Sequence, residues 1–274
     1  MSADVVPLAQ ASAAALRPRL RDAGAADVLR NATVVACTMT WVPLVLVLDR
    51  GAGIWSQRAL GLGTVALLLV LLRRETPLVR AQVAVVVAFA TAVEYTFSPL
   101  LEVYVYRLDN VPAFVPPGHG LVYLCALALG RTTAFRARRS ALVAATVAVG
   151  GAYSGWGLLV SDRPDVLGAF WFCCLLGFLR WGRSTTLYVG AFVVVTYLEI
   201  LGTWLGTWEW ALRDPTGLVA IGNPPSGAAG GYGWFDLAAV LAAPWVLHVV
   251  RRVWSPLSVG DPGAVSSASP TPAP

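Results

Sequence analysis

Two glutamates in this sequence lie inside apolar segments, each close to the point where the segment becomes polar. Glu94 occurs in FATAVEYTF and Glu199 in VVTYLEILG. A carboxylate at such a depth in a bilayer is costly, so residues of this kind usually face a bundle interior or a wet cavity. Apolar surroundings favour the neutral form of a carboxyl, and a second carboxyl nearby favours it further. The two side chains therefore have the chemistry of a general acid and base pair.

Each glutamate is followed by the same series of residue types. Two aromatic residues separated by one other residue come first, then Arg and Asp, and then a proline-containing segment. These are Tyr104, Tyr106, Arg107, Asp109 and VPPG in one half, and Trp208, Trp210, Arg213, Asp214 and NPPSG in the other. Matched positions lie 104 to 108 residues apart. The spacing favours an internal duplication, with repeats 32–135 and 140–250, over chance similarity between two membrane interfaces. We expect the glutamates to meet across the repeat interface, and each Arg–Asp pair to form a local ion pair.

Other polar and aromatic residues allow more than one interpretation. Asp236, in WFDLAAVL, is either a helix cap or a third catalytic acid. A lone histidine such as His119 is usually structural, but it lies at the start of a predicted span and is a candidate substrate contact. Asn223, in GNPPSG, can cap, turn or bind ligand. Trp204, Trp208 and Trp210 cluster beside Glu199 and, with Tyr104 and Tyr106, predict an aromatic pocket for an apolar or cationic guest.

The composition is that of a polytopic membrane protein. The chain has 274 residues, of which 57% are hydrophobic and 13% charged. A soluble protein of this size could not bury so much apolar surface. All 20 basic residues are Arg, and they form no long run, so nucleic acid is not the expected partner. The four cysteines fall in apolar runs without CxxC spacing, which predicts core residues and no metal site.

A transmembrane helix needs about 20 apolar residues. The sequence predicts an all-α bundle with eight of them, at 32–48, 56–72, 80–98, 118–135, 140–160, 166–180, 185–207 and 234–250. With both termini cytoplasmic, fifteen arginines fall inside and five outside, as the positive-inside rule requires. Residues 1–31 are then a cytoplasmic lead-in without a signal peptide, and 253–274 a disordered cytoplasmic tail. The long polar connections 99–117 and 208–233 face outward from a bacterial inner (plasma) membrane.

Motif searches exclude several classes of enzyme. The sequence has no P-loop, GxSxG, HExxH or dinucleotide fingerprint, and its two histidines, His119 and His248, cannot build the iron boxes of membrane desaturases. No cofactor is therefore expected.

The series of a glutamate near the end of a span, Tyr104-x-Tyr106 and a short Val-Pro segment resembles membrane carotenoid-biosynthesis proteins of the bacterioruberin hydratase type. The second half, TWEW…GLVAIGNPPSG, is similar to that family and to heterodimeric-type lycopene cyclases. The resemblance covers about a fifth of the chain. The cyclases carry paired glutamates after the proline, where this chain reads Asn223, Pro224, Pro225 and Ser226. The resemblance implies a long isoprenoid substrate and protonation of an alkene.

The leading hypothesis is an integral-membrane enzyme that hydrates or cyclises an isoprenoid or similar lipid by acid–base chemistry. Glu94, Glu199 and Asp236 are its candidate catalytic residues. A proton-coupled transporter or flippase is the first alternative, and a non-catalytic membrane scaffold is the second.

Overall fold

The computed structural model describes residues 6–254, with side chains described for 24–250 and 252. The predicted tail falls outside the described residues from 255 onward, and the part of the predicted lead-in from Val6 belongs to the first helix. The elements in chain order are α1 (Val6–Asp49), α2 (Ile54–Leu72), α3 (Pro77–Tyr95), η1 (Thr96–Leu100), β1 (Tyr104–Tyr106), α4 (Val115–Arg131), α5 (Thr133–Ala137), α6 (Arg139–Leu159), α7 (Val166–Trp181), α8 (Thr185–Leu205), β2 (Trp208–Trp210) and α9 (Ala228–Trp254). The described chain is nearly all-α, as predicted.

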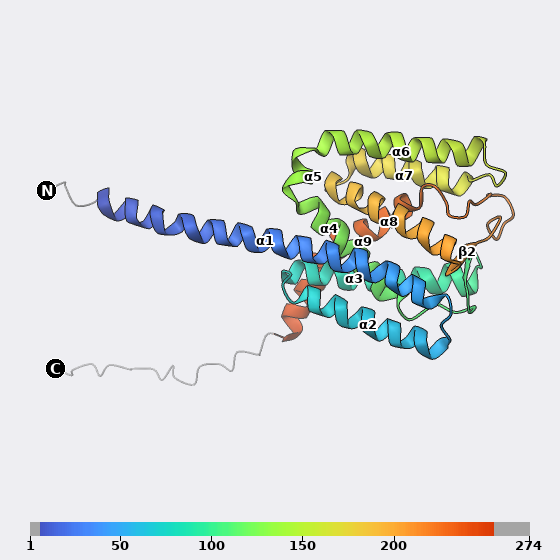
Figure 1. Cartoon of the computed structure of the whole chain (residues 1–274), viewed down its shortest axis with the longest axis horizontal. Helices are drawn as coiled ribbons and strands as arrows, with labels where there is room; N and C mark the ends of the chain where they lie inside the picture. Colours follow the sequence, from blue (N-terminus) through green and yellow to red (C-terminus); the bar gives the residue numbers. More distant parts are fainter. Residues whose placement is uncertain (1–5, 255–274) are drawn as a thin grey trace, which may run out of the picture.

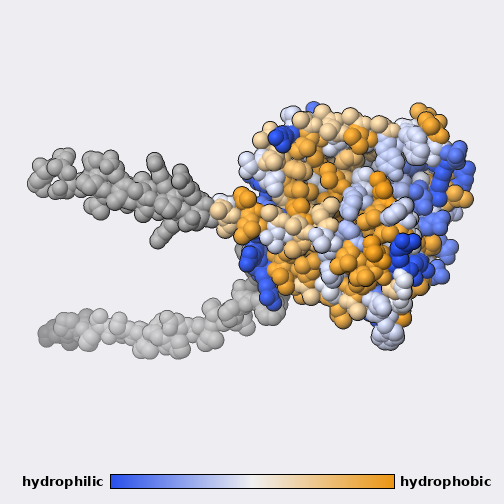
Figure 2. Space-filling view, in the orientation of Figure 1, coloured by the Kyte–Doolittle hydropathy of each residue, from blue (hydrophilic) through white to orange (hydrophobic). Residues whose placement is uncertain are grey.

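Six helical segments are long and apolar enough to cross a membrane, which fits a multi-pass membrane protein. They are Gly24–Asp49, Ile54–Leu72, Pro77–Leu100, Arg139–Leu159, Thr185–Leu205 and Ala228–Val250. The predicted spans 118–135 and 166–180 correspond to the shorter helices α4 and α7, of 17 and 16 residues. In Figure 2, hydrophobic residues cover much of the bundle's side, and hydrophilic residues gather toward its ends.

The helix α4 runs through the centre of the bundle. It packs against α1, α2, α3 and α8, and most of its residues are buried. Helix α3 also packs extensively against α9, and α4 against α8. The buried cluster around Val83, Leu121 and Leu124 joins these helices. Because α4 is surrounded by protein, it can place a histidine and a tyrosine inside the bundle.

The two polar connections of the chain lie at one end of the bundle (Figure 1). The paired strands β1 and β2 are at that end, while α5 and the far end of α9 are at the other. At the opposite end the buried carboxylate of Glu75 accepts two hydrogen bonds from Arg131, at 3.0 and 3.1 Å, and pairs with Arg30 at 3.4 Å. This ion-pair cluster ties α1 and α4 to the α2–α3 connection.

The last helix begins earlier than predicted, at Ala228 instead of 234. The run AAGGYG is helical because its glycines pack directly on α7. A side chain at Gly230 would collide with the backbone of Trp171, and one at Gly233 with the ring of Phe178. Asp236 therefore lies in the third turn of α9, fully inside the helix, and the interpretation of Asp236 as a helix cap is wrong.

Candidate functional site

Glu94 lies near the end of α3, where the chain turns back on itself. The helix continues as the π-helical turn η1, which contains Pro99, and the chain then extends as β1. Side chains alternate across a strand, so Tyr104 and Tyr106 point inward and Val105 outward. Both phenolic hydroxyls donate to Oε2 of Glu94, Tyr104 at 2.9 Å and Tyr106 at 2.7 Å. We call this group the tyrosine clamp.

His119 holds the other oxygen of the same carboxyl. It lies in the second turn of α4, and its Nε2 is 2.7 Å from Oε1 of Glu94. The imidazole stacks on Tyr232, with the ring centroids 5.1 Å apart, and also packs against Phe235. Its Nδ1 is buried and has no hydrogen-bond partner among the described residues. His119, predicted as a substrate contact, is thus a direct partner of Glu94.

Glu199, on α8, is held by an equivalent arrangement. Helix α8 ends at Leu205 and is capped by Gly206 in the left-handed conformation, with φ of +72°, which lets the chain turn sharply into β2. Trp208 and Trp210 point inward from this strand and donate their indole N–H groups to Oε2 of Glu199, at 3.1 and 3.2 Å. We call this group the tryptophan clamp. Among the described hydrogen bonds, Oε1 of Glu199 accepts none.

The two clamps are joined by the pairing of their strands. Strands β1 and β2 are antiparallel, with Tyr104 opposite Trp210 and Tyr106 opposite Trp208. The rings of Tyr104 and Trp210 lie 4.6 Å apart. Burial, and then the charge of Glu94, raise the pKa of Tyr104 and of Tyr106 well above the ordinary value, so both phenols stay protonated and remain donors.

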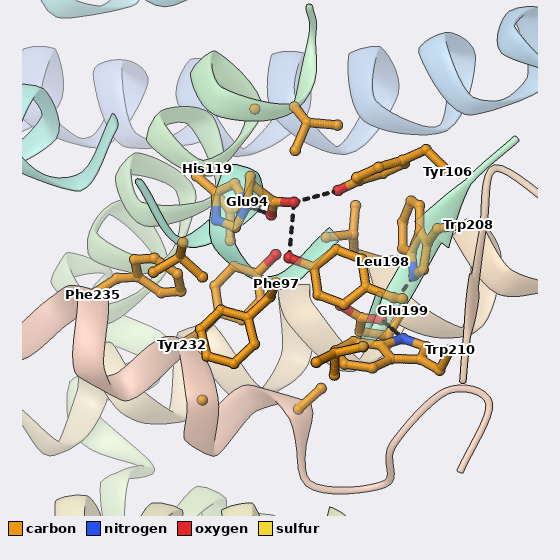
Figure 3. Close-up of a pocket in the computed structure, with 18 of the residues that line it drawn as sticks. Glu94, Phe97, Tyr106, His119, Leu198, Glu199, Trp208, Trp210, Tyr232 and Phe235 are labelled. Carbon is orange, nitrogen blue, oxygen red and sulfur yellow. Dashed lines mark hydrogen bonds and ion pairs between the residues drawn. The ribbon is translucent and has the colours of Figure 1, made fainter. Parts of the chain in front are cut away.

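Both glutamates line a single cavity of about 500 Å³. Its wall consists mainly of aromatic and aliphatic side chains from α1, α3, α4, α7, α8 and α9, with the two clamps on one side. Figure 3 shows Glu94 between His119 and Tyr106, Glu199 beside Trp208 and Trp210, and Tyr232 and Phe235 from α9. The cavity thus combines two buried carboxyls with aromatic faces, which can stabilise a cation.

Three predicted site residues lie outside this cavity wall. Asp236 is buried, but it follows the cavity-lining Phe235 and therefore points to another side of α9; its Oδ2 has no partner among the described residues. Trp204 is 77% exposed on the outer surface of α8. Asn223 is exposed and accepts a hydrogen bond from the backbone N–H of Trp210 at 3.2 Å, so it holds β2 in place.

Sequence reasoning missed the aromatic residues that complete the cavity, notably Tyr232, Phe235 and Trp171. It also missed Asp165, at the start of α7. The buried carboxylate of Asp165 accepts three backbone N–H groups, from Gly168 and Gly222 at 2.9 Å and from Ser226 at 2.6 Å. An acid just before an apolar run signals a helix cap, but no pattern in the sequence indicates that it also fixes a loop about 60 residues later.

The prediction that Arg107 pairs with Asp109 and Arg213 with Asp214 in local ion pairs is wrong. Arg107 reaches back to the connection after α1, where it donates to the carbonyl of Ala52 at 2.6 Å and lies 3.5 Å from Asp49. Arg213 donates to the carbonyl of Gly217 at 3.1 Å. Arg163 has the anchoring role in the second half, donating to the carbonyls of Trp210 at 2.5 Å, Ala211 at 2.8 Å and Ile221 at 2.7 Å. These contacts hold the strands over the cavity.

Among the side chains that the structure describes (24–250 and 252), no group of three or more His, Cys, Asp or Glu is placed to hold a metal ion. Fold and site together define a multi-pass helical protein with two clamped carboxyls in one aromatic cavity. Comparison with protein-family models, with curated proteins and with solved structures finds no match.

Proposed function

We propose that this chain is an integral-membrane enzyme that protonates an alkene of an isoprenoid or similar lipid and completes a hydration or a cyclisation. The observation that carries the proposal is the placement of two buried carboxyls, with different hydrogen-bond partners, in one aromatic cavity. The chemistry requires only a proton and, for hydration, a water molecule, so no cofactor is called for.

The hydrogen bonds distinguish the roles of the two carboxyls. Glu94 is surrounded by donors, because two phenols donate to Oε2 and the Nε2–H tautomer of His119 donates to Oε1. In such a set both carboxyl oxygens act as acceptors, which suits the role of a base. Glu199 is held through Oε2 alone, so Oε1 can carry the proton that is given to the substrate. Glu199 is therefore the proposed acid and Glu94, with His119, the proposed base.

The reaction is balanced by these two groups. The proton of Glu199 adds to one carbon of the double bond, and the π electrons form the new C–H bond and leave a carbocation on the other carbon. The rings of Tyr104, Trp210 and Tyr232 flank the cavity and stabilise this cation. In hydration, water attacks the cation and Glu94 takes the released proton. In cyclisation, a second double bond attacks and Glu94 removes a proton from the cyclic cation. Return of the proton to Glu199 resets the enzyme.

The proposal includes eight spans in a bacterial plasma membrane, with both termini cytoplasmic and the cavity toward the outer side. Under this topology α4 and α7 also cross as short helices, α4 surrounded by protein and α7 packed against α6, α8 and α9. The proposed duplication is supported by the strand register: Val105 is opposite Glu209, so a two-fold axis between them relates Tyr104 to Trp208 and Tyr106 to Trp210. The packing of α3 on α9 and of α4 on α8 follows the same relation.

The proposal is tested by profiling the lipids of an isoprenoid-producing bacterial host by liquid chromatography and mass spectrometry. The host expresses the wild type, Glu94→Gln, Glu199→Gln or the control Glu209→Gln. Glu209 lies between the two clamp tryptophans, but it is exposed and points away from the cavity. We expect a product heavier by one water, or an isomer of unchanged mass, in the wild type and the control only. A product that persists in both cavity variants would refute the proposal.

A proton-coupled transporter is the second candidate, favoured by Asp236. This carboxyl is buried in α9 and takes part in none of the described salt bridges. An ionisable group inside a span often marks a proton pathway. Proteoliposomes with an imposed pH gradient test this function: isoprenoid or organic-cation flux should depend on the gradient and stop in Asp236→Asn. Flux that is unchanged in this variant would rule out the role of Asp236.

A further inference from the structure

One row of side chains belongs both to the cavity wall and to the outer surface. Phe89, Val93, Phe97 and Leu101, which we call the entrance row, follow each other at intervals of four residues along α3 and its continuation. Residues four apart share one face of a helix, so Phe89, Val93 and Phe97 follow one face, and Leu101 comes directly after η1. Phe89 is 38% exposed, and Phe97 and Leu101 are each 39% exposed. Side chains that line a cavity and are also exposed mark its opening.

Helix α9 borders the same opening. Its Trp234 is 49% exposed and also lines the cavity, and Gly231, beside it in the wall, contributes no side chain. Phe89 packs against Phe235 with ring centroids 5.2 Å apart, which closes the opening toward the middle of the bundle. The exposed parts of the wall on α3, η1 and α9 are therefore apolar.

An apolar opening of this kind suits entry from the bilayer. Most of the entrance row lies within the apolar segment Pro77–Leu100, and Trp234 lies within Ala228–Val250, both of which are long enough to cross a membrane. A water-soluble solute that used this opening would have to pass half-exposed Phe and Leu side chains. A hydrocarbon chain would pass from lipid tails to side chains of the same polarity, without a desolvation cost.

We propose that a linear isoprenoid enters sideways between the entrance row and α9, with one unsaturated end reaching the two carboxyls and the rest of its chain remaining in the bilayer. This inference rests on the proposed function and adds the route and the part of the substrate that is bound. The cavity volume of about 500 Å³ is in the range that holds a drug-sized ligand, which is enough for one end of a long isoprenoid.

The route is tested by photo-cross-linking of the full chain, reconstituted in phosphatidylcholine vesicles that contain alkyne-tagged geranylgeraniol. The photoreactive residue p-benzoylphenylalanine replaces Phe97 in one variant and Trp204 in the control. Trp204 is also an exposed aromatic residue near the end of a span, but it does not line the cavity. We expect labelling at position 97 to exceed that at 204 by about tenfold, a preference of about 1.4 kcal/mol for the entrance. Unlabelled geranylgeraniol should suppress the labelling, and hexadecanol should not.

Equal labelling at the two positions, no labelling at either, or equal suppression by hexadecanol would overturn the proposed route. Both variants replace surface residues, and size-exclusion chromatography checks that they fold. The Phe97 experiment is repeated in the Glu94→Gln/Glu199→Gln background, where labelling should be unchanged because entry precedes chemistry. Failure of the enzymatic proposal, with no product in the lipid profiles, is thereby distinguished from failure of the entry route.

Discussion

The replacement of Asp165 by Asn tests how the second polar connection is held over the cavity. In the native protein Oδ1 accepts the N–H groups of Gly168 and Gly222, and Oδ2 accepts that of Ser226. Asparagine keeps one oxygen, which can serve the first two donors. Its NH₂ group then faces the N–H of Ser226, so two donors meet where a short hydrogen bond existed. The side-chain volume hardly changes, so the substitution isolates this exchange of an acceptor for a donor.

The expected cost follows from the bonds affected. Loss of one hydrogen bond to a charged group, with a buried N–H left unsatisfied, costs about 2–4 kcal/mol. The two remaining bonds weaken by roughly 1 kcal/mol in total when the acceptor becomes neutral. Loss of a negative charge at the start of α7 adds about 0.5 kcal/mol. The sum is about 3.5–5.5 kcal/mol, which lowers the melting temperature by roughly 10–15 °C for a chain of this size.

The measurement is a thermal melt of the detergent-solubilised protein, followed by the fluorescence of its 11 tryptophans. Asp162→Asn is the matched control. Asp162 lies with Asp165 in the short connection between α6 and α7, but it is exposed, and its replacement removes the same charge. We expect the control to melt within about 1 °C of the wild type, as surface substitutions usually do. If Asp165→Asn melted together with Asp162→Asn, the three backbone bonds would not stabilise the loop, and the reasoning would be refuted.

Three further predictions concern the clamps and the ion-pair cluster. Gly202→Ala should lower the melting temperature, because the new Cβ would collide with the indole ring of Trp208. The control Gly155→Ala has open space around it and should be neutral or stabilise α6 by up to about 1 kcal/mol. Equal melting temperatures for the two variants would contradict this prediction. Glu75→Gln should destabilise the protein by about 3–5 kcal/mol in the same assay, because two guanidinium groups lose their buried counter-charge, and an unchanged melt would disprove it. Since the pKa values of Tyr104 and Tyr106 are raised in the folded state, their contribution to stability is complete below about pH 10 and is lost as the pH rises further. Melts of the Tyr104→Phe/Tyr106→Phe variant across this range should therefore fall less steeply than those of the wild type, and parallel curves would argue against the shift.

The helical bundle and the clamps show how far local sequence reasoning reaches. Long apolar runs predict helices because a helix satisfies its backbone hydrogen bonds within one segment, as the inside of a membrane requires. The tyrosine clamp joins residues only 10 and 12 positions apart, and the tryptophan clamp residues 9 and 11 apart. A helix followed by a turn and a strand returns to its own end over such a distance, so the grouping of each glutamate with its aromatics could be predicted.

Residues close in sequence can nevertheless point to different places, and here the predictions failed. Trp204 is five positions after Glu199, which turns it well over a quarter of the way around the helix and onto the outer surface. Asp236 follows Phe235 by one position, and that single step takes it out of the cavity wall. The glycine-rich segment before Asp236 was expected to be a loop, but its contacts with α7 make it helical.

The sequence by itself therefore determined a nearly all-α protein with apolar, membrane-length helices and two carboxyls each flanked by its own aromatic pair. It did so because these features depend on neighbours along the chain. Only the tertiary structure decided that the two carboxyls share one cavity, through the pairing of β1 with β2. It alone brought His119 to Glu94 and Asp165 to the loop at Gly222. Those contacts depend on the rotation and depth of helices against one another, which are set by packing between distant segments.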